Sequence, residues 1–278
     1  MDVQKAHQPL ALVTGGSSGI GRALAARLVE RGFDVVVAAE DDGVHETART
    51  LTERGGDVRA VQVDLATADG AKRLHDEVAG LGRPLAAAAL NAGVAVGGEF
   101  LHTSLDDDLR LVDLNCRSTV HLAKLVVRDM VAVGEGLLLL TSSIAAAAPS
   151  PYQATYGASK AFVHSFAEAL RHELRGTGVT VTSLVPGPTD TAIFERGGLE
   201  STAIATGRKD DPADVARDAV DAMLDGRAVV VTGPVTNRVQ VAAAGLLPSW
   251  VAAHLVARRT RPGSGTKTDA DQAREESR

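Results

Sequence analysis

The sequence predicts an α/β fold in one domain: a doubly wound parallel sheet of about seven strands with helices on both faces. Short runs rich in valine and leucine alternate with longer helical stretches, which is typical of a parallel sheet covered on both faces. The length of 278 residues suits one such domain. Only 3% of the residues are aromatic, so small aliphatic side chains must fill the core, and these suit helices packed closely on a sheet.

Seven short apolar segments are expected to form the strands, because each has the length and the aliphatic content of a buried strand. They are residues 10–14, 34–39, 58–63, 85–90, 137–141, 179–185 and 228–232. The longer stretches between them are expected to be helices, at residues 19–31, 44–54, 71–79, 105–133 and 154–175, with a further helix begun by Pro212. Glycines follow the second, fourth and fifth of these helices, where a left-handed residue commonly ends a helix.

The composition excludes several classes of protein. A net charge of −6 argues against a general nucleic-acid binder, because such domains are usually basic. Cys116 is the one cysteine, so no internal disulfide can form, and a small buried thiol is the simplest interpretation. Residues 1–9 are polar and no apolar stretch is long enough to cross a membrane, so the expected location is cytoplasmic. The histidines show no metal-ligand spacing, and no metal is predicted.

A glycine-rich segment directly follows the first expected strand and opens a helix. It has the spacing G-x3-G-x-G, made by Gly15, Gly19 and Gly21. Glycines at such a turn let the backbone approach a pyrophosphate, whose charge then lies at the helix N-terminus. A tight strand-to-helix turn with no ligand is the alternative, but the position after the first strand favours phosphate binding.

Three further segments follow this turn in a fixed order. They are Asn91-Ala92-Gly93 after the fourth strand, Tyr156-Gly157-Ala158-Ser159-Lys160 on the fifth helix, and the Pro186-Gly187 segment after the sixth strand. Together with Thr14 and the glycine-rich turn, they resemble the short-chain dehydrogenase/reductase family over roughly residues 10–232. The resemblance implies a Rossmann-type fold and an NAD(P)-dependent oxidoreductase acting on an alcohol or ketone.

The candidate catalytic residues centre on Tyr156 and Lys160, which lie four apart and therefore share one helix face. A nearby ammonium favours the phenolate and lowers the tyrosine pKa, which suits proton exchange. Such a pair also occurs by chance on exposed helices. The resemblance assigns substrate-oxygen binding to Ser143 rather than Ser142, contact with the cofactor ribose to Lys160, and a proton relay to Asn115. Asparagine is also unfavourable inside a helix, which independently hints at function.

The resemblance further implies a set of cofactor-binding residues. They are Gly15, Ser17, Ser18, Gly19, Ile20, Gly21, Glu40, Asp64, Leu65, Asn91, Ala92, Gly93, Tyr156, Lys160, Pro186, Gly187, Thr189 and Thr191. A carboxylate at the end of the second strand, here Glu40, can bind the ribose hydroxyls of NAD and repel the 2′-phosphate of NADP. We therefore expect NAD to be favoured over NADP, although NAD-preferring relatives usually carry the acid where Ala39 stands. A solvated acidic loop is the alternative.

Three stretches lie outside the alternating pattern. Residues 188–211 look irregular, and a loop this long is usually functional. Residues 237–261 are apolar and end among arginines, which allows a helix on a membrane surface. A segment folded over the substrate cleft or packed against another subunit is favoured, because few basic residues precede Arg258. We expect a catalytic domain at residues 8–236, a helical extension at 237–261 and a disordered tail at 262–278.

The leading interpretation is an active oxidoreductase, because Ser143, Tyr156 and Lys160 are all present. A catalytically silent NAD(P)-binding regulatory or scaffold protein on the same fold is the alternative, and an epimerase or dehydratase using the same Tyr and Lys is a third. Residues 144–155 contain no charge, which predicts a neutral small-molecule alcohol or ketone, unless Arg196 or Arg208 binds an anion. The expected assembly is a homodimer or homotetramer.

Overall fold

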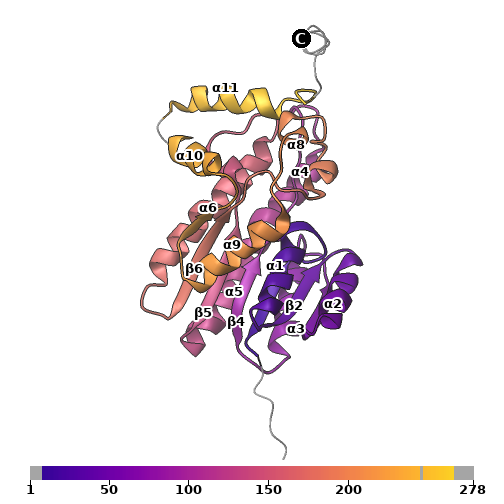
Figure 1. The fold of residues 1–278 in the computed structure, drawn as a ribbon, viewed down its shortest axis with the longest axis vertical. Helices are drawn as coiled ribbons and strands as arrows, with labels where there is room; N and C mark the ends of the chain where they lie inside the picture. Colours follow the sequence, from indigo (N-terminus) through magenta and orange to yellow (C-terminus); the bar gives the residue numbers. More distant parts are fainter. Residues whose placement is uncertain (1–7, 245–246, 266–278) are drawn as a thin grey trace, which may run out of the picture.

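The computed structural model describes residues 8–244 and 247–265, and a parallel sheet of seven strands forms its centre (Figure 1). The strands run in the order β3-β2-β1-β4-β5-β6-β7. Their bounds are β1 Leu10–Thr14, β2 Asp34–Ala39, β3 Val58–Gln62, β4 Leu85–Leu90, β5 Gly136–Thr141, β6 Val179–Val185 and β7 Val229–Val231. All neighbours pair in parallel, so every strand ends at the same edge. The order reverses between β1 and β4, where doubly wound sheets bind ligands.

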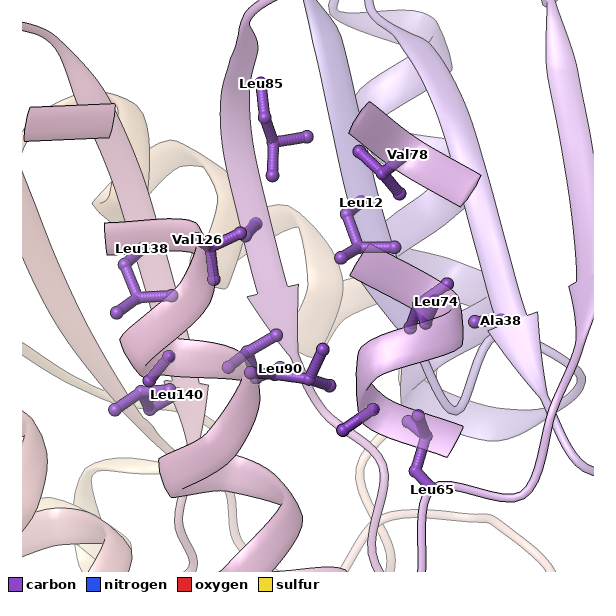
Figure 2. Close-up of a cluster of buried hydrophobic side chains, with 14 of the residues drawn as sticks. Leu12, Ala38, Leu65, Leu74, Val78, Leu85, Leu90, Val126, Leu138 and Leu140 are labelled. Carbon is purple, nitrogen blue, oxygen red and sulfur yellow. The ribbon is translucent and has the colours of Figure 1, made fainter. Parts of the chain in front are cut away.

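Three helices cover each face of the sheet. On one face are α1 (Gly19–Glu30), α2 (Gly43–Glu53) and α9 (Pro212–Leu224), which pack on side chains such as Val13 and Val37. On the other are α3 (Ala68–Ala79), α5 (Ser118–Val133) and α6 (Ala154–Glu173). Figure 2 shows this second core, in which Leu12, Leu90 and Leu138 of the sheet meet Leu74 and Val126 of the helices. Side chains that alternate along each strand therefore feed two separate cores, because successive residues point to opposite faces.

The helix expected at residues 105–133 is interrupted. It comprises α4 (Leu105–Val112), one turn of π-helix over Asp113–Arg117, and α5. A π-helical turn holds an extra residue, and such turns are frequent at functional sites. Here the turn carries Asn115, which is buried.

The segment expected to be irregular contains two short helices, α7 (Ile193–Arg196) and α8 (Ala203–Thr206). Backbone hydrogen bonds close its base, from Asp190 N to Asp210 O at 2.9 Å and from Asp210 N to Pro188 O at 2.8 Å. Residues 188–211 therefore form a loop whose two ends are hydrogen-bonded to each other.

Two more helices, α10 (Val235–Ala244) and α11 (Ser249–Thr260), lie at the end of the molecule that also holds α8 and α4 (Figure 1). Thr260 Oγ1 donates to the carbonyl of Pro151 at 2.8 Å, which anchors the end of α11 to the segment before α6. Gly265 N donates to Ser201 O at 2.9 Å, whereas the rest of the tail expected to be disordered lies outside the described residues from 266 on. No helix in the described ranges is long and apolar enough to cross a membrane.

Candidate active site

The glycine-rich turn joins β1 to α1 at the edge where the strands end. A Cβ at position 21 would lie 2.0 Å from the carbonyl oxygen of Gly15, and one at position 15 would lie 2.9 Å from Cα of Ala92. Gly15 and Gly19 also have φ values of 67° and 53°, which glycine adopts without strain. Ser18 precedes α1 without a side-chain cap bond, so the helix N-terminus keeps its N–H groups for an anion. These residues fit the pyrophosphate of a dinucleotide.

Asn91 ties this turn to the neighbouring strands. Its backbone N and that of Ala92 both donate to Thr14 Oγ1 at 3.0 Å. Its side-chain amide donates to Thr14 O at 3.2 Å and accepts from Thr141 Oγ1 at 3.2 Å. The ends of β1, β4 and β5 are thereby held together, which fixes one wall of the cleft.

The cleft above this edge has a volume of about 170 Å³. Sixteen of the eighteen predicted cofactor-binding residues line it: Gly15, Ser17, Ser18, Gly19, Ile20, Gly21, Glu40, Asp64, Leu65, Asn91, Ala92, Gly93, Tyr156, Lys160, Pro186 and Thr191. The other two, Gly187 and Thr189, line a second, adjoining cleft. The sequence segments that carry the predicted residues are thus brought to one edge of the sheet.

Acidic side chains gather at the end of this cleft that lies beyond β2 and β3. Ser17 Oγ donates to Asp41 Oδ2 at 2.9 Å, whereas Glu40 forms an ion pair with Arg110 of α4. Arg110 also lies 3.1 Å from Asp64 Oδ2. Burial alone would raise the pKa of Asp64, but the hydrogen bonds from Arg110 and from the backbone N–H of Ala66 hold it below its usual value.

Lys160 is buried on α6 with only 4% of its surface exposed. Its Nζ donates to the carbonyl of Thr141 at 3.0 Å, at the end of β5. Burial lowers the pKa of Lys160 to about 8, because the charged form loses its water. The ammonium lies 5.9 Å from the centre of the Tyr156 ring on the preceding turn.

Tyr156 and Ser143 lie together at the mouth of this region. Ser143 follows β5 and accepts a hydrogen bond from Ala145 N at 3.1 Å. Burial raises the pKa of Tyr156, and the Ser143 side chain opposes the shift only in part. This differs from the lowered pKa expected from the sequence, because the Lys160 ammonium is directed to the Thr141 carbonyl and burial penalises the phenolate. At neutral pH the hydroxyl therefore keeps its proton.

Asn115 connects three elements from the π-helical turn. Its Oδ1 accepts from Val94 N at 3.0 Å, and its Nδ2 donates to Val94 O at 3.0 Å and to Ser159 Oγ at 2.9 Å. A Cβ at position 93 would lie 3.0 Å from Asn115 Oδ1 and 3.2 Å from Lys160 Nζ, so Gly93 allows these two groups to approach. Asn115 thus holds the segment after β4 against α6 beside Lys160.

A second cleft, of about 360 Å³, opens on the other side of Tyr156. Its lining is mostly apolar and comes from the segment after β5, from α7, and from α10 and α11. Among the described residues that line it, Arg259 is the one charged side chain. The predicted anion-binding candidates lie elsewhere: Arg196 lines the first cleft, and Arg208 lines neither.

The sequence motifs missed several residues of both clefts. Arg110 carries no motif and lines neither cleft, but it pairs with Glu40 and Asp64, which line the first one. Leu247, Leu255 and Arg259 of the C-terminal segment line the second cleft. The apolar character of residues 237–261 was the signal for them, and the interpretation as a cover over the cleft agrees with their position. Cys116, beside Asn115, is half-buried, and burial raises its pKa.

Comparison with known proteins gives consistent matches. A family model described as short chain dehydrogenase matches residues 9–202. The chain is 36% identical over 214 residues to the 1-deoxy-11-beta-hydroxypentalenate dehydrogenase of Streptomyces avermitilis, covering 76% of this chain and 78% of that protein. Among solved structures, the short-chain dehydrogenase from Sphingobium yanoikuyae in complex with NADPH superposes with a TM-score of 0.75 at 28% identity, covering 86% of this chain and 94% of that one. A short-chain dehydrogenase/reductase from Burkholderia phymatum in complex with NAD gives 0.77 at 25% identity, over 86% and 95% of the two chains.

Proposed function

The chain belongs to the short-chain dehydrogenase family, and on that premise we propose that it transfers a hydride between NAD and a neutral, largely apolar secondary alcohol or ketone, with Tyr156 as the proton donor and acceptor. It is an oxidoreductase that acts on CH–OH groups with a nicotinamide cofactor. The proposal adds the residues that do the chemistry, the kind of substrate and the cofactor that is preferred.

One observation carries the proposal: Tyr156 lines both clefts. The first cleft has the glycine cradle and the helix N-terminus that suit a dinucleotide, and the second is apolar. A group placed at their junction can meet the phenol hydroxyl from the apolar side while a nicotinamide lies on the other side. Ser143, which lines the apolar cleft, stands beside the same hydroxyl.

When bound, the nicotinamide supplies or accepts the hydride. For ketone reduction, the Ser143 hydroxyl donates a hydrogen bond to the substrate carbonyl oxygen and stabilises its developing negative charge. Tyr156 then donates its proton to that oxygen, and the raised pKa of the phenol keeps this proton in place at neutral pH. Lys160 and Asn115, joined through the segment around Gly93, hold the path by which the phenolate is reprotonated. Alcohol oxidation follows the same residues in reverse.

NAD is proposed as the preferred cofactor because carboxylates gather at the adenosine end of the cleft. Glu40 and Asp41 follow β2, and the glycine-rich turn beside them carries Ser17 and Ser18 in place of basic residues. Carboxylates repel the 2′-phosphate that distinguishes NADP. One similar structure contains NADPH and another contains NAD, so a nicotinamide cofactor is common to both.

Assembly as a homodimer or homotetramer is part of the proposal. Apolar side chains are exposed along α4, α5 and α6, including Leu109, Val112, Val120 and Phe162. Contiguous apolar surface often marks a protein contact, and we propose that these side chains form one. Light scattering after size-exclusion chromatography measures the mass directly, and a monomer would contradict this part of the proposal.

The activity itself is tested by screening alcohols and ketones with NAD(H) and NADP(H) while following the absorbance of the reduced nicotinamide. We expect turnover of apolar secondary alcohols or ketones by the native chain and its loss in Tyr156→Phe. Binding of a nicotinamide without turnover of any substrate would favour the catalytically silent alternative.

A further inference from the structure

The negative charge at the adenosine end of the cofactor cleft is not shared equally among its carboxylates. Glu40, Asp41 and Asp64 all line this end of the cleft. Arg110 pairs with Glu40 and Asp64, whereas Asp41 receives only neutral hydrogen bonds, from Ser17 Oγ at 2.9 Å and from Gly43 N at 3.0 Å. Within the described residues, Asp41 therefore keeps its full charge toward the ligand and Glu40 does not.

Arg110 is held in this position from both sides. Its Nη1 lies 3.1 Å from Asp64 Oδ2 and its Nη2 contacts Glu40 Oε2. The two carboxylates raise the pKa of Arg110, through the hydrogen bond to Asp64 first and then through the charge of Glu40, although burial opposes the shift. The backbone of Glu40 is fixed as well, because Gln62 Nε2 of β3 donates to its carbonyl at 3.0 Å.

We propose that Arg110 is a specificity-determining residue for the cofactor: it masks the charge of Glu40 and leaves Asp41 as the carboxylate that discriminates against a 2′-phosphate. This rests on the proposed function, in that the cleft binds a nicotinamide dinucleotide. Opposite charges in contact cancel much of each other's field at a distance, so a phosphate arriving near β2 meets Asp41 unscreened but Glu40 only as half of a pair. The residue that sets the balance comes from α4, far in sequence from the glycine-rich turn and from β2.

A basic residue near the adenosine usually favours NADP(H), because it attracts the 2′-phosphate. For Arg110 we expect no such direct contact, so its removal has a different effect. Removing Arg110 leaves the charge of Glu40 unpaired, so the affinity for NADP(H) falls. The affinity for NAD(H) changes little, because its adenosine ribose carries no phosphate. Removing the carboxylate of Asp41 has the reverse effect and brings the two affinities together. Removing Glu40 together with Arg110 leaves Asp64 as the one partner of Arg110 that can still be uncovered.

The test is direct titration of the full-length chain with NADH and with NADPH, followed by nicotinamide fluorescence or calorimetry, which needs no substrate. Arg110→Met keeps the aliphatic stem and removes the charge. We expect its ratio of Kd for NADPH to Kd for NADH to rise by about five- to tenfold over that of the native chain. Arg110→Lys should stay near the native ratio, and Asp41→Asn should lower it. In the Arg110→Met, Glu40→Gln double variant the rise should disappear, because the two residues act as one unit.

Arg217→Met is the matched control. Arg217 pairs with two carboxylates, Asp214 and Asp218, and its side chain is 51% exposed against 43% for Arg110. It lies on α9, and its two partners line neither cleft, whereas the partners of Arg110 line the first. An unchanged Kd ratio in Arg110→Met, equal to that of Arg217→Met, would overturn the inference. So would a rise that persists in the double variant, since Arg110 would then act on the phosphate directly or through Asp64, and not through Glu40. Failure of the native chain to bind either dinucleotide would instead refute the proposed function.

Discussion

The side chain of Lys160 is buried, and burial destabilises its charged form. Its ammonium is nearly enclosed and relies on the Thr141 carbonyl at 3.0 Å, and its pKa falls to about 8. Tyr156 nearby is shifted in the other direction, because the phenolate is the form that burial penalises. Both shifts favour the neutral form of each side chain. The protonated phenol is the state that the proposed mechanism requires for carbonyl reduction.

Tyr156→Phe is expected to lower turnover by about 10²- to 10⁴-fold, the usual worth of a positioned general acid, while the Kd for NADH stays nearly the same. The ring remains and only the proton donor is lost. Steady-state rates and fluorescence titration measure the two effects separately. Tyr152→Phe is the control, because it alters the chain's other tyrosine, which packs under Arg261. Retention of most of the activity in Tyr156→Phe would refute the mechanism.

The buried lysine also predicts a pH dependence of stability. The pKa of Lys160 is about 8 in the folded chain and 10.5 is its ordinary value, so the folded state releases the proton more readily than the unfolded state. Below pH 8 both states are protonated and the folded state bears the full penalty. As the pH rises from 8 to 10.5, this penalty disappears.

We therefore expect the native chain to gain about 3 kcal/mol of unfolding free energy relative to Lys160→Met over this pH interval. Subtracting the two denaturation curves at each pH removes the contribution of all other titrating groups. A difference that stays constant between pH 8 and 10.5 would show that Lys160 is not buried as a charge.

Some elements can be predicted from the sequence and others cannot. The strands and most helices follow from aliphatic runs and terminal glycines, because those patterns come directly from burial on a two-sided sheet. The π-helical turn does not, since one added residue in a helix leaves no composition signal apart from Asn115 itself. The short helices α7 and α8 escaped prediction because four residues are too few to show a helical period.

The turn from β1 to α1 has little room for any added side-chain atom. Gly21→Ala places a Cβ 2.0 Å from the carbonyl oxygen of Gly15, and the backbone must move to relieve it. We expect a loss of about 1–3 kcal/mol of stability and a weaker Kd for NADH by at least about tenfold. Gly80→Ala is the control, because its Cβ would lie 3.2 Å from Asp76 O at the end of α3, a contact that a small shift relieves.

Chemical denaturation and NADH titration report the two effects in parallel. If Gly21→Ala bound NADH as well as Gly80→Ala does, the glycine-rich turn would not be the pyrophosphate site.

The whole molecule places two clefts of different chemistry on either side of one tyrosine. The sheet brings the motif residues to one edge, and that cleft could be predicted because motif order and sheet topology together define it. The apolar cleft depends on α10 and α11 folding back over this edge, and no local pattern in residues 237–261 specifies that path. The apolar content of residues 237–261 indicated only that this segment packs against another surface, and not which one. Residues 144–155, which contain no charge, indicated one apolar wall of this cleft, but the wall made by α10 and α11 could only come from the structure.

The composition of the apolar cleft leads to a prediction about substrate charge. Its described lining offers many aliphatic contacts and one charged side chain, Arg259, which is exposed. A carboxylate entering such a cleft loses water without a buried partner, which is costly. For ketones matched in size, we expect kcat/KM to be at least about tenfold higher for the neutral member than for the anionic one, a difference of about 1.4 kcal/mol.

Two variants decide whether an arginine changes this outcome. Arg259→Met keeps the stem that lines the cleft and removes the charge, and Arg208→Met removes an exposed charge that lines neither cleft. The neutral preference should persist in both, because it arises from the apolar walls. A preference of the native chain for the anionic ketone that vanishes in Arg259→Met but survives in Arg208→Met would instead make Arg259 the partner of a substrate carboxylate. The substrate would then be an apolar molecule with an acidic end, and the neutral assignment would be wrong.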